Sequence, residues 1–104
     1  MNEKEFEPEV IKINDSEDAY LDANGDLFIS GADYMEGMDD YEWFFAVNSE
    51  HFPILYKKLS GISEPPEDIA NELIKFLQEN GKRVSDLTDI CKANGIAHHF
   101  SNWM

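Results

Sequence analysis

Cysteine, basic residues and long apolar runs are all scarce in this 104-residue chain. The single cysteine, Cys91, cannot form an internal disulfide, which suits a reducing compartment such as the cytoplasm. No run of about 18 apolar residues occurs, so no membrane-spanning helix is expected. The N-terminal MNEKEFEPEV is acidic and lacks an apolar segment, so it does not predict a secretory signal. These absences favour a cytoplasmic protein.

The motifs of common enzymes and metal sites are also missing. No GxSxG, P-loop or GxGxxG pattern occurs, and no CxxC or HExxH spacing indicates zinc. His98 and His99 are adjacent, so on a strand they would point to opposite faces and could not readily share an ion. Cys91 lies on the apolar stripe of an expected helix, where a thiol is usually a small core residue. No catalytic residue, metal ligand or cofactor is predicted.

The DANGD stretch has some features of a calcium-binding loop. Asp22, Asn24 and Asp26 match the first, third and fifth positions of an EF-hand loop. Leu27 stands at the sixth position, where glycine allows the sharp turn, and Asp33 replaces the glutamate of the twelfth. The stretch also lies in an expected hairpin rather than between two helices. A dedicated calcium site is therefore not predicted.

Negative charge is abundant and unevenly distributed. The chain has 22 acidic and 8 basic residues, a formal net charge of −14. Residues 1–50 hold 15 acidic residues and two lysines, whereas residues 51–104 hold seven acidic and six basic residues. The electrostatic field of such a charge repels nucleic acid phosphates and anionic membranes, and it attracts basic partners. Because solubility alone would not require this clustering, we expect a basic protein partner and no direct binding to nucleic acid or membrane.

Length and composition predict a single α+β domain over residues 1–104, with an acidic arm at 1–9. A hydrophobic content of 42% is ordinary for a globular protein. Asn24-Gly25 separates two short runs with strand character and predicts a β-hairpin, because both residues readily adopt positive φ. The aromatic run YEWFFAV, residues 41–47, predicts a central strand covered on much of both faces.

Three amphipathic segments predict helices. The first and third follow a serine that can cap a helix N-terminus, and the second is opened by Ser63 with the pair Pro65-Pro66. Each precedes a glycine that can end it in the left-handed conformation. The segments are 50–59 between Ser49 and Gly61, 67–80 between Ser63 and Gly81, and 86–94 between Ser85 and Gly95. The alternating tail IAHHFSNWM predicts a closing strand. We therefore expect a mainly antiparallel sheet with two or three helices packed on one face.

The most acidic stretch is GADYMEGMDDYEWFFAV, residues 31–47, in which aromatic residues stand among five carboxylates. Carboxylates can steer and pair with Lys or Arg, and aromatic side chains supply buried anchor area, so the composition suits docking onto a basic groove. Trp43, Phe44 and Phe45 are assigned to the strand core instead. The predicted partner-binding residues are Asp33, Tyr34, Glu36, Asp39, Asp40, Tyr41 and Glu42.

Three stretches in residues 40–104 resemble a known family. They are DDYEWFFAVNSEHFPILYKKLSG, the helical ELIKFLQENG and the closing NGIAHHFSNW. Together they resemble the bacterial immunity proteins of polymorphic toxin systems, including contact-dependent growth inhibition. The resemblance implies a non-enzymatic protein that binds its cognate toxin domain tightly, often a basic RNase or DNase, and blocks the toxin's active site in the cytoplasm. It implies no particular set of binding residues.

Two other functions stay open at this level. An acidic adaptor could bind another basic protein without inhibiting an enzyme. A hydrolase could use two of the clustered carboxylates as an acid–base pair. The carboxylate pattern has little specificity, however, since many pairings within the cluster would satisfy it. The oligomeric state has no signal in the sequence.

Overall fold

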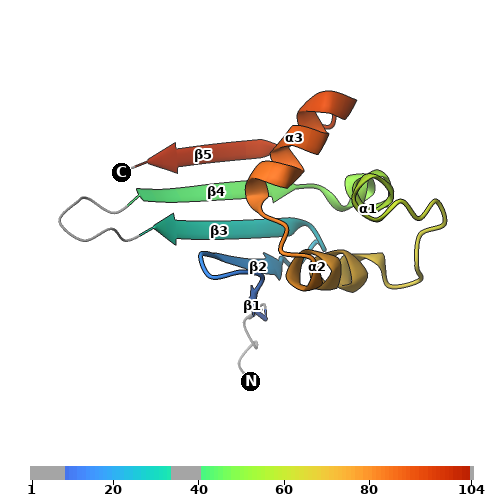
Figure 1. The fold of residues 1–104 in the computed structure, drawn as a ribbon, viewed down its shortest axis with the longest axis horizontal. Coiled ribbons are helices and arrows are strands. Elements are labelled where there is room, and N and C mark those ends of the chain that lie inside the picture. The colour runs from blue at the N-terminus through green and yellow to red at the C-terminus, as the bar shows by residue number, and fades with distance from the viewer. Residues whose placement is uncertain (1–8, 34–40, 104) are drawn as a thin grey trace, which may run out of the picture.

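A computed structural model describes residues 9–33 and 41–103 of the chain. The predicted arm, apart from Glu9, lies outside these residues. Five strands form one antiparallel sheet whose spatial order follows the sequence (Figure 1). Their bounds are β1 (Ile11–Lys12), β2 (Glu17–Leu21), β3 (Leu27–Asp33), β4 (Tyr41–Val47) and β5 (His99–Trp103). The predicted hairpin, aromatic strand and closing strand are all present, and the aromatic strand pairs on both sides.

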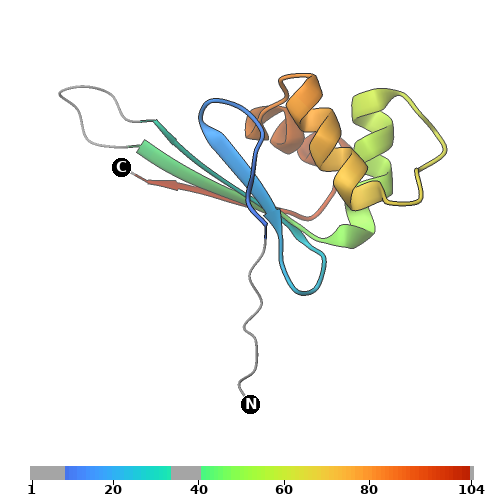
Figure 2. The same ribbon diagram turned by 90° about the horizontal axis from the view of Figure 1, so that it is seen from below.

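Three helices cover one face of this sheet, at the end where β4 finishes and β5 begins (Figures 1 and 2). They are α1 (Phe52–Ser60), α2 (Ile69–Glu79) and α3 (Val84–Asn94), and a short 3₁₀ helix, η1 (Ser49–His51), leads into α1. The expected α+β architecture is confirmed. Within residues 9–33 and 41–103, no helix combines the length and apolar character that a membrane span requires.

The core forms between the helices and the sheet face they cover. Ala19, Ile29 and Phe45 are register partners across β2, β3 and β4, and all three are buried. The predicted helical stripes pack against them, with Leu55, Leu73 and Leu87 among others fully buried. Aromatic β4 is therefore covered by helices on one face only. The expectation that both faces would be largely covered is wrong, because all three helices pack on the same side.

The β2–β3 hairpin turns through five residues rather than through an Asn-Gly pair alone. Gly25 has a positive φ of 83°, and no described residue other than glycine takes a positive φ. The Asp22 carboxylate accepts hydrogen bonds from the backbone N–H groups of Asn24 (2.9 Å) and Asp26 (3.0 Å). This side chain holds the longer loop, so Asn24 need not adopt the left-handed conformation expected of it.

All three helix starts differ from those predicted, α2 beginning at Ile69 instead of residue 67, whereas the helix ends agree to within one residue. Ser49 begins η1 instead of capping α1, and its N–H donates to the Asp26 carboxylate (2.9 Å). The helix predicted after Ser85 begins earlier, and the Asp86 carboxylate accepts from the Arg83 N–H just before its first turn (2.9 Å). Gly61 (φ 80°) and Gly95 (φ 65°) end α1 and α3 as expected.

A glycine in the middle of β3 makes room for the largest side chain of β4. Gly31 is buried and is the register partner of Trp43, whose indole ring lies over it. A Cβ added at Gly31 would overlap the indole ring. The indole in turn donates from Nε1 to Oε2 of Glu17 on β2 (2.7 Å). Gly31 thus allows a contact that ties β2 to β4 across the intervening strand.

We expect Gly31→Ala to lower the free energy of unfolding by about 1–3 kcal/mol, because the added methyl must displace the Trp43 ring. Urea unfolding followed by circular dichroism measures this. Ser30→Ala on the same strand is the control and should change stability by less than about 0.5 kcal/mol. In Gly31→Ala with Trp43→Leu the two losses should not add. If the two losses of stability add, the strain in Gly31→Ala does not come from the Trp43 ring.

Candidate functional site

The structure places only part of the predicted acidic segment. Asp33 ends β3 and Tyr41 begins β4, and the two are register partners. Glu42 follows on β4 opposite Ala32 and is half-buried. These residues lie at the end of the sheet that the helices leave uncovered (Figure 1). The remaining predicted residues, Tyr34, Glu36, Asp39 and Asp40, lie outside the described residues.

The sheet face turned away from the helices carries a row of aromatic side chains. Tyr20 and Phe28 are stacked, with ring centroids 5.3 Å apart. Phe28 lies 5.7 Å from Phe44, and Phe44 lies 6.2 Å from His99. The row thus runs from β2 through β3 and β4 to the edge strand β5. We call Tyr20, Phe28, Phe44 and His99 the aromatic row.

The aromatic row stays in contact with solvent. Tyr20, Phe28 and Phe44 are half-buried and His99 is exposed, and Figure 2 shows all three helices on the other side of the sheet. Cross-strand aromatic pairs stabilise a sheet by about 0.5–1.5 kcal/mol each, so part of the role is structural. A continuous aromatic surface on an uncovered sheet face is also a common feature of interaction sites.

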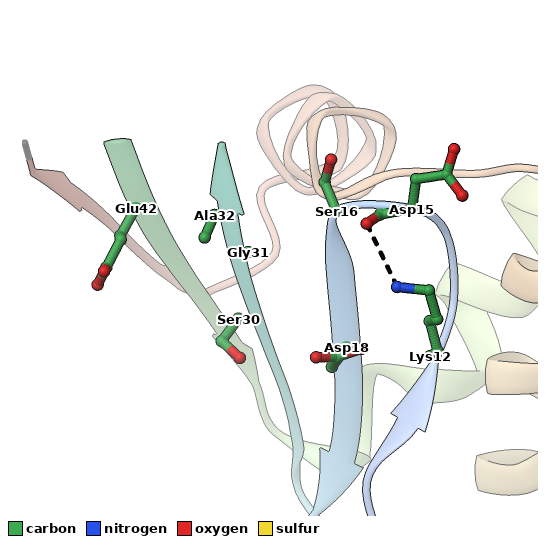
Figure 3. Close-up of a pocket in the computed structure, with 8 residues that line it drawn as sticks. All are labelled: Lys12, Asp15, Ser16, Asp18, Ser30, Gly31, Ala32 and Glu42. Carbon is green, nitrogen blue, oxygen red and sulfur yellow. Dashed lines mark hydrogen bonds between the residues drawn. The ribbon is translucent and has the colours of Figure 1, made fainter. Parts of the chain in front are cut away.

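A polar hollow of about 360 Å³ lies beside the aromatic row on the β1–β4 part of the sheet (Figure 3). The floor of the hollow is formed by three consecutive residues of β3, Ser30, Gly31 and Ala32. All three are small, so they fill little of the hollow. Its other lining residues are Lys12, Asp15, Ser16, Asp18 and Glu42. We call this feature, with these eight residues, the acidic hollow.

The charges that line the acidic hollow are unequal. Three carboxylates, Asp15, Asp18 and Glu42, stand against one ammonium, Lys12. The Lys12 Nζ donates to the backbone carbonyl of Asp15 (3.3 Å), and Figure 3 shows the Asp18 carboxylate turned toward β3. A hollow with this lining attracts a cationic group and repels an anionic one.

A second hollow, of about 240 Å³, lies between the sheet and the start of α3. Glu17, only 2% exposed, contributes its carboxylate to the lining. That carboxylate accepts from Asn14 Nδ2 (2.8 Å), Trp43 Nε1 (2.7 Å) and the Val84 N–H (3.1 Å). Because three donors from separate parts of the chain converge on it, Glu17 joins the sheet to α3. We assign this hollow a structural role.

The other candidate side chains of the sequence, Cys91 and the carboxylates of the DANGD stretch, occupy structural positions. Cys91 is buried in the core, and burial raises the pKa of its thiol. The Asp22 and Asp26 carboxylates of the DANGD stretch hold the hairpin and the start of η1. Among residues 9–33 and 41–103, no group of three His, Cys, Asp or Glu side chains could hold a metal ion.

We expect Cys91 to stay unmodified by Ellman's reagent in the native protein at pH 7. The thiolate is the reactive form, and a raised thiol pKa keeps Cys91 protonated at pH values at which a free cysteine begins to ionise. In urea above the unfolding transition, one thiol per chain should react at once. Fast labelling without urea would contradict the buried position, and the absorbance at 412 nm reports both states.

Comparison with protein-family models, with curated protein sequences and with solved structures finds no match for this chain. The assignment of Phe44 to the strand core is wrong, since Phe44 lies half-buried on the uncovered face. The sequence indicated the acidic segment but missed the aromatic row, although YL before the turn and LFI after it signal strands. Which of their side chains share a face with Phe44 and His99 depends on the register of four strands.

Proposed function

We propose that this chain is a non-enzymatic immunity protein of the bacterial cytoplasm. It neutralises a basic toxin nuclease, which we propose is an RNase, by stoichiometric binding. The observation that carries the proposal is the uncovered face of the sheet, which combines the aromatic row with the acidic hollow. The resemblance of residues 40–104 to immunity proteins supplies the biological setting.

The fold separates the charges of the chain into two layers. Residues 9–33 and 41–50 form β1 to β4 and η1, and they carry nine acidic residues and one lysine. Residues 51–103, which include all three helices, carry seven acidic and six basic residues. The acidic layer is therefore the one whose outer face the helices leave free. Such a layer attracts a basic partner over a long range and raises its association rate about 10–10³-fold.

Neutralisation would follow from occlusion. A nuclease presents a cationic groove to the phosphates of its substrate, and an inhibitor that covers this groove must place negative charge there. Desolvated charge pairs in another nuclease–inhibitor complex show coupling energies of roughly 1.5–7 kcal/mol. Aromatic side chains next to the carboxylates add apolar contact area, which is typical of interface anchors.

Co-expression tests the proposal directly. If the gene immediately upstream ends in a toxin-like C-terminal domain, that domain is the partner to co-express, and the readouts are growth of the host and co-purification. We expect restored growth and a stable 1:1 complex. If the toxin domain still kills and nothing co-purifies, the proposal is wrong. A complex without restored growth would also contradict it, and would favour an acidic adaptor that binds without inhibiting.

A further inference from the structure

The acidic hollow and the aromatic row share three strands and form one continuous surface. On β2, Asp18 and Tyr20 are two positions apart and therefore point to the same face. On β4, Glu42 and Phe44 have the same relation. The register partners Asp18 and Ser30, and Ser30 and Phe44, connect these strands in one line across the sheet. A partner lying across β2 to β4 would contact both features at once.

Charge restricts the occupant of this surface. Around the acidic hollow the carboxylates outnumber the single ammonium by three to one. A second copy of the chain would bring its own net charge of −14 against this face, and nucleic acid or an anionic membrane would bring phosphates. All three are repelled. A basic protein segment that also carries apolar side chains complements both parts of the surface.

The arrangement of the carboxylates favours arginine over lysine. Asp18 is on β2 and Glu42 is on β4, with the small residues of β3 between them. A lysine ammonium is a compact charge, so it can pair with the carboxylate on one side of the hollow at a time. A guanidinium is planar and has five N–H donors in a fixed fork, so it can donate to carboxylates on two sides.

We infer that the uncovered face is the docking surface for an arginine-bearing segment of a basic protein. An arginine side chain enters the acidic hollow between Asp18 and Glu42, and neighbouring apolar side chains pack on the aromatic row. This inference rests on the proposed function for the identity of the partner as a toxin. It goes further by assigning the surface, which lies on the outer face of β2, β3 and β4.

The first experiment needs no toxin. The probe is the peptide acetyl-Leu-Arg-Leu-Arg-Leu-amide, titrated into ¹⁵N-labelled protein and followed by amide chemical shifts. We expect shifts concentrated on β2, β3 and β4, and binding about threefold or more weaker for the peptide with lysine in place of arginine, because the ammonium lacks the fork. Equal binding of the two peptides, or shifts spread over all acidic segments, would overturn the assignment.

Matched variants sharpen this test. Ser30→Arg places a guanidinium of the chain itself at the floor of the acidic hollow and should weaken peptide binding about tenfold or more, since the site is filled and neutralised. Ser63→Arg adds the same group at an exposed position between α1 and α2 and should leave binding unchanged. Asp18→Asn with Glu42→Gln removes two charges without added bulk, and Glu64→Gln with Glu67→Gln is its control.

The toxin complex then separates this inference from the proposed function. If Ser30→Arg abolishes toxin binding and Ser63→Arg does not, both stand. If the toxin is neutralised and Ser30→Arg binds it with unchanged Kd, the surface assignment is overturned and the immunity function remains. If no toxin is neutralised but the arginine peptide binds the native protein and Ser30→Arg weakens this binding, the surface assignment stands and the immunity function is overturned.

Discussion

Glu17→Ala is expected to lower the free energy of unfolding by about 3–5 kcal/mol, because three donors lose their acceptor at once and each unsatisfied buried group costs about 1–3 kcal/mol. That is a large fraction of the roughly 5–15 kcal/mol that stabilises a typical domain. The substitution removes one acceptor from three donors: the amide of Asn14, the indole of Trp43 and the buried N–H of Val84. Hydrogen bonds to charged groups contribute about 1.5–3 kcal/mol each.

The loss of stability should extend beyond the surroundings of Glu17, because the three donors belong to different elements. Asn14 precedes β2, Trp43 lies on β4 and Val84 begins α3. Loss of the Glu17 carboxylate therefore loosens α3 from the sheet as well as the two strands from each other. Hydrogen exchange should report this, with the largest loss of protection in the first turn of α3.

The control for Glu17 is its neighbour on the opposite face. Asp18→Ala removes the same kind of group from a half-exposed position and should change stability by less than about 0.5 kcal/mol. In Glu17→Gln, one oxygen can still accept from Asn14 and Val84, but the amide nitrogen faces the Trp43 N–H. Adding Trp43→Phe should then cost less than it does in the native background. A Glu17→Ala loss below about 1 kcal/mol would show that Glu17 does not join the elements.

Asp39→Lys with Asp40→Lys is expected to slow association with the proposed basic toxin about tenfold or more at low ionic strength, with the fold intact. The reason is long-range attraction, which falls as the local negative charge is reversed. Both residues belong to the predicted partner-binding segment, between the paired strand ends Asp33 and Tyr41. Stopped-flow fluorescence across a range of salt concentrations measures the association rate, and the difference between variants should shrink as salt rises.

A matched charge reversal in the helical layer distinguishes the effect of where the charges lie from the effect of net charge. Glu64→Lys with Glu67→Lys changes the total charge by the same amount, at exposed positions between α1 and α2. We expect it to slow association much less. If both double variants slow association equally, only the net charge matters and the acidic segment is not the recognition surface. If neither does, the interface lies elsewhere.

Local signals predicted much of the fold and only one part of the candidate surface. The acidic segment was visible because its carboxylates are contiguous in sequence. Glu17 was not, since an acidic residue next to Asp15 and Asp18 has the local pattern of an exposed acidic turn. Its burial depends on Trp43 and on the start of α3, which are 26 and 67 residues away along the chain. The aromatic row has the same origin, in contacts between four strands.

By itself, the sequence determined what depends on near neighbours: the hairpin around Gly25, the apolar stripes of three helices, the glycines that end two of them, and the uneven charge. The tertiary structure alone decided where each helix starts, which face of the sheet stays uncovered, and which side chains share it. The physical reason is that a helix and a turn are specified within a few residues. The register and covering of a sheet are settled only when distant strands and helices pack together.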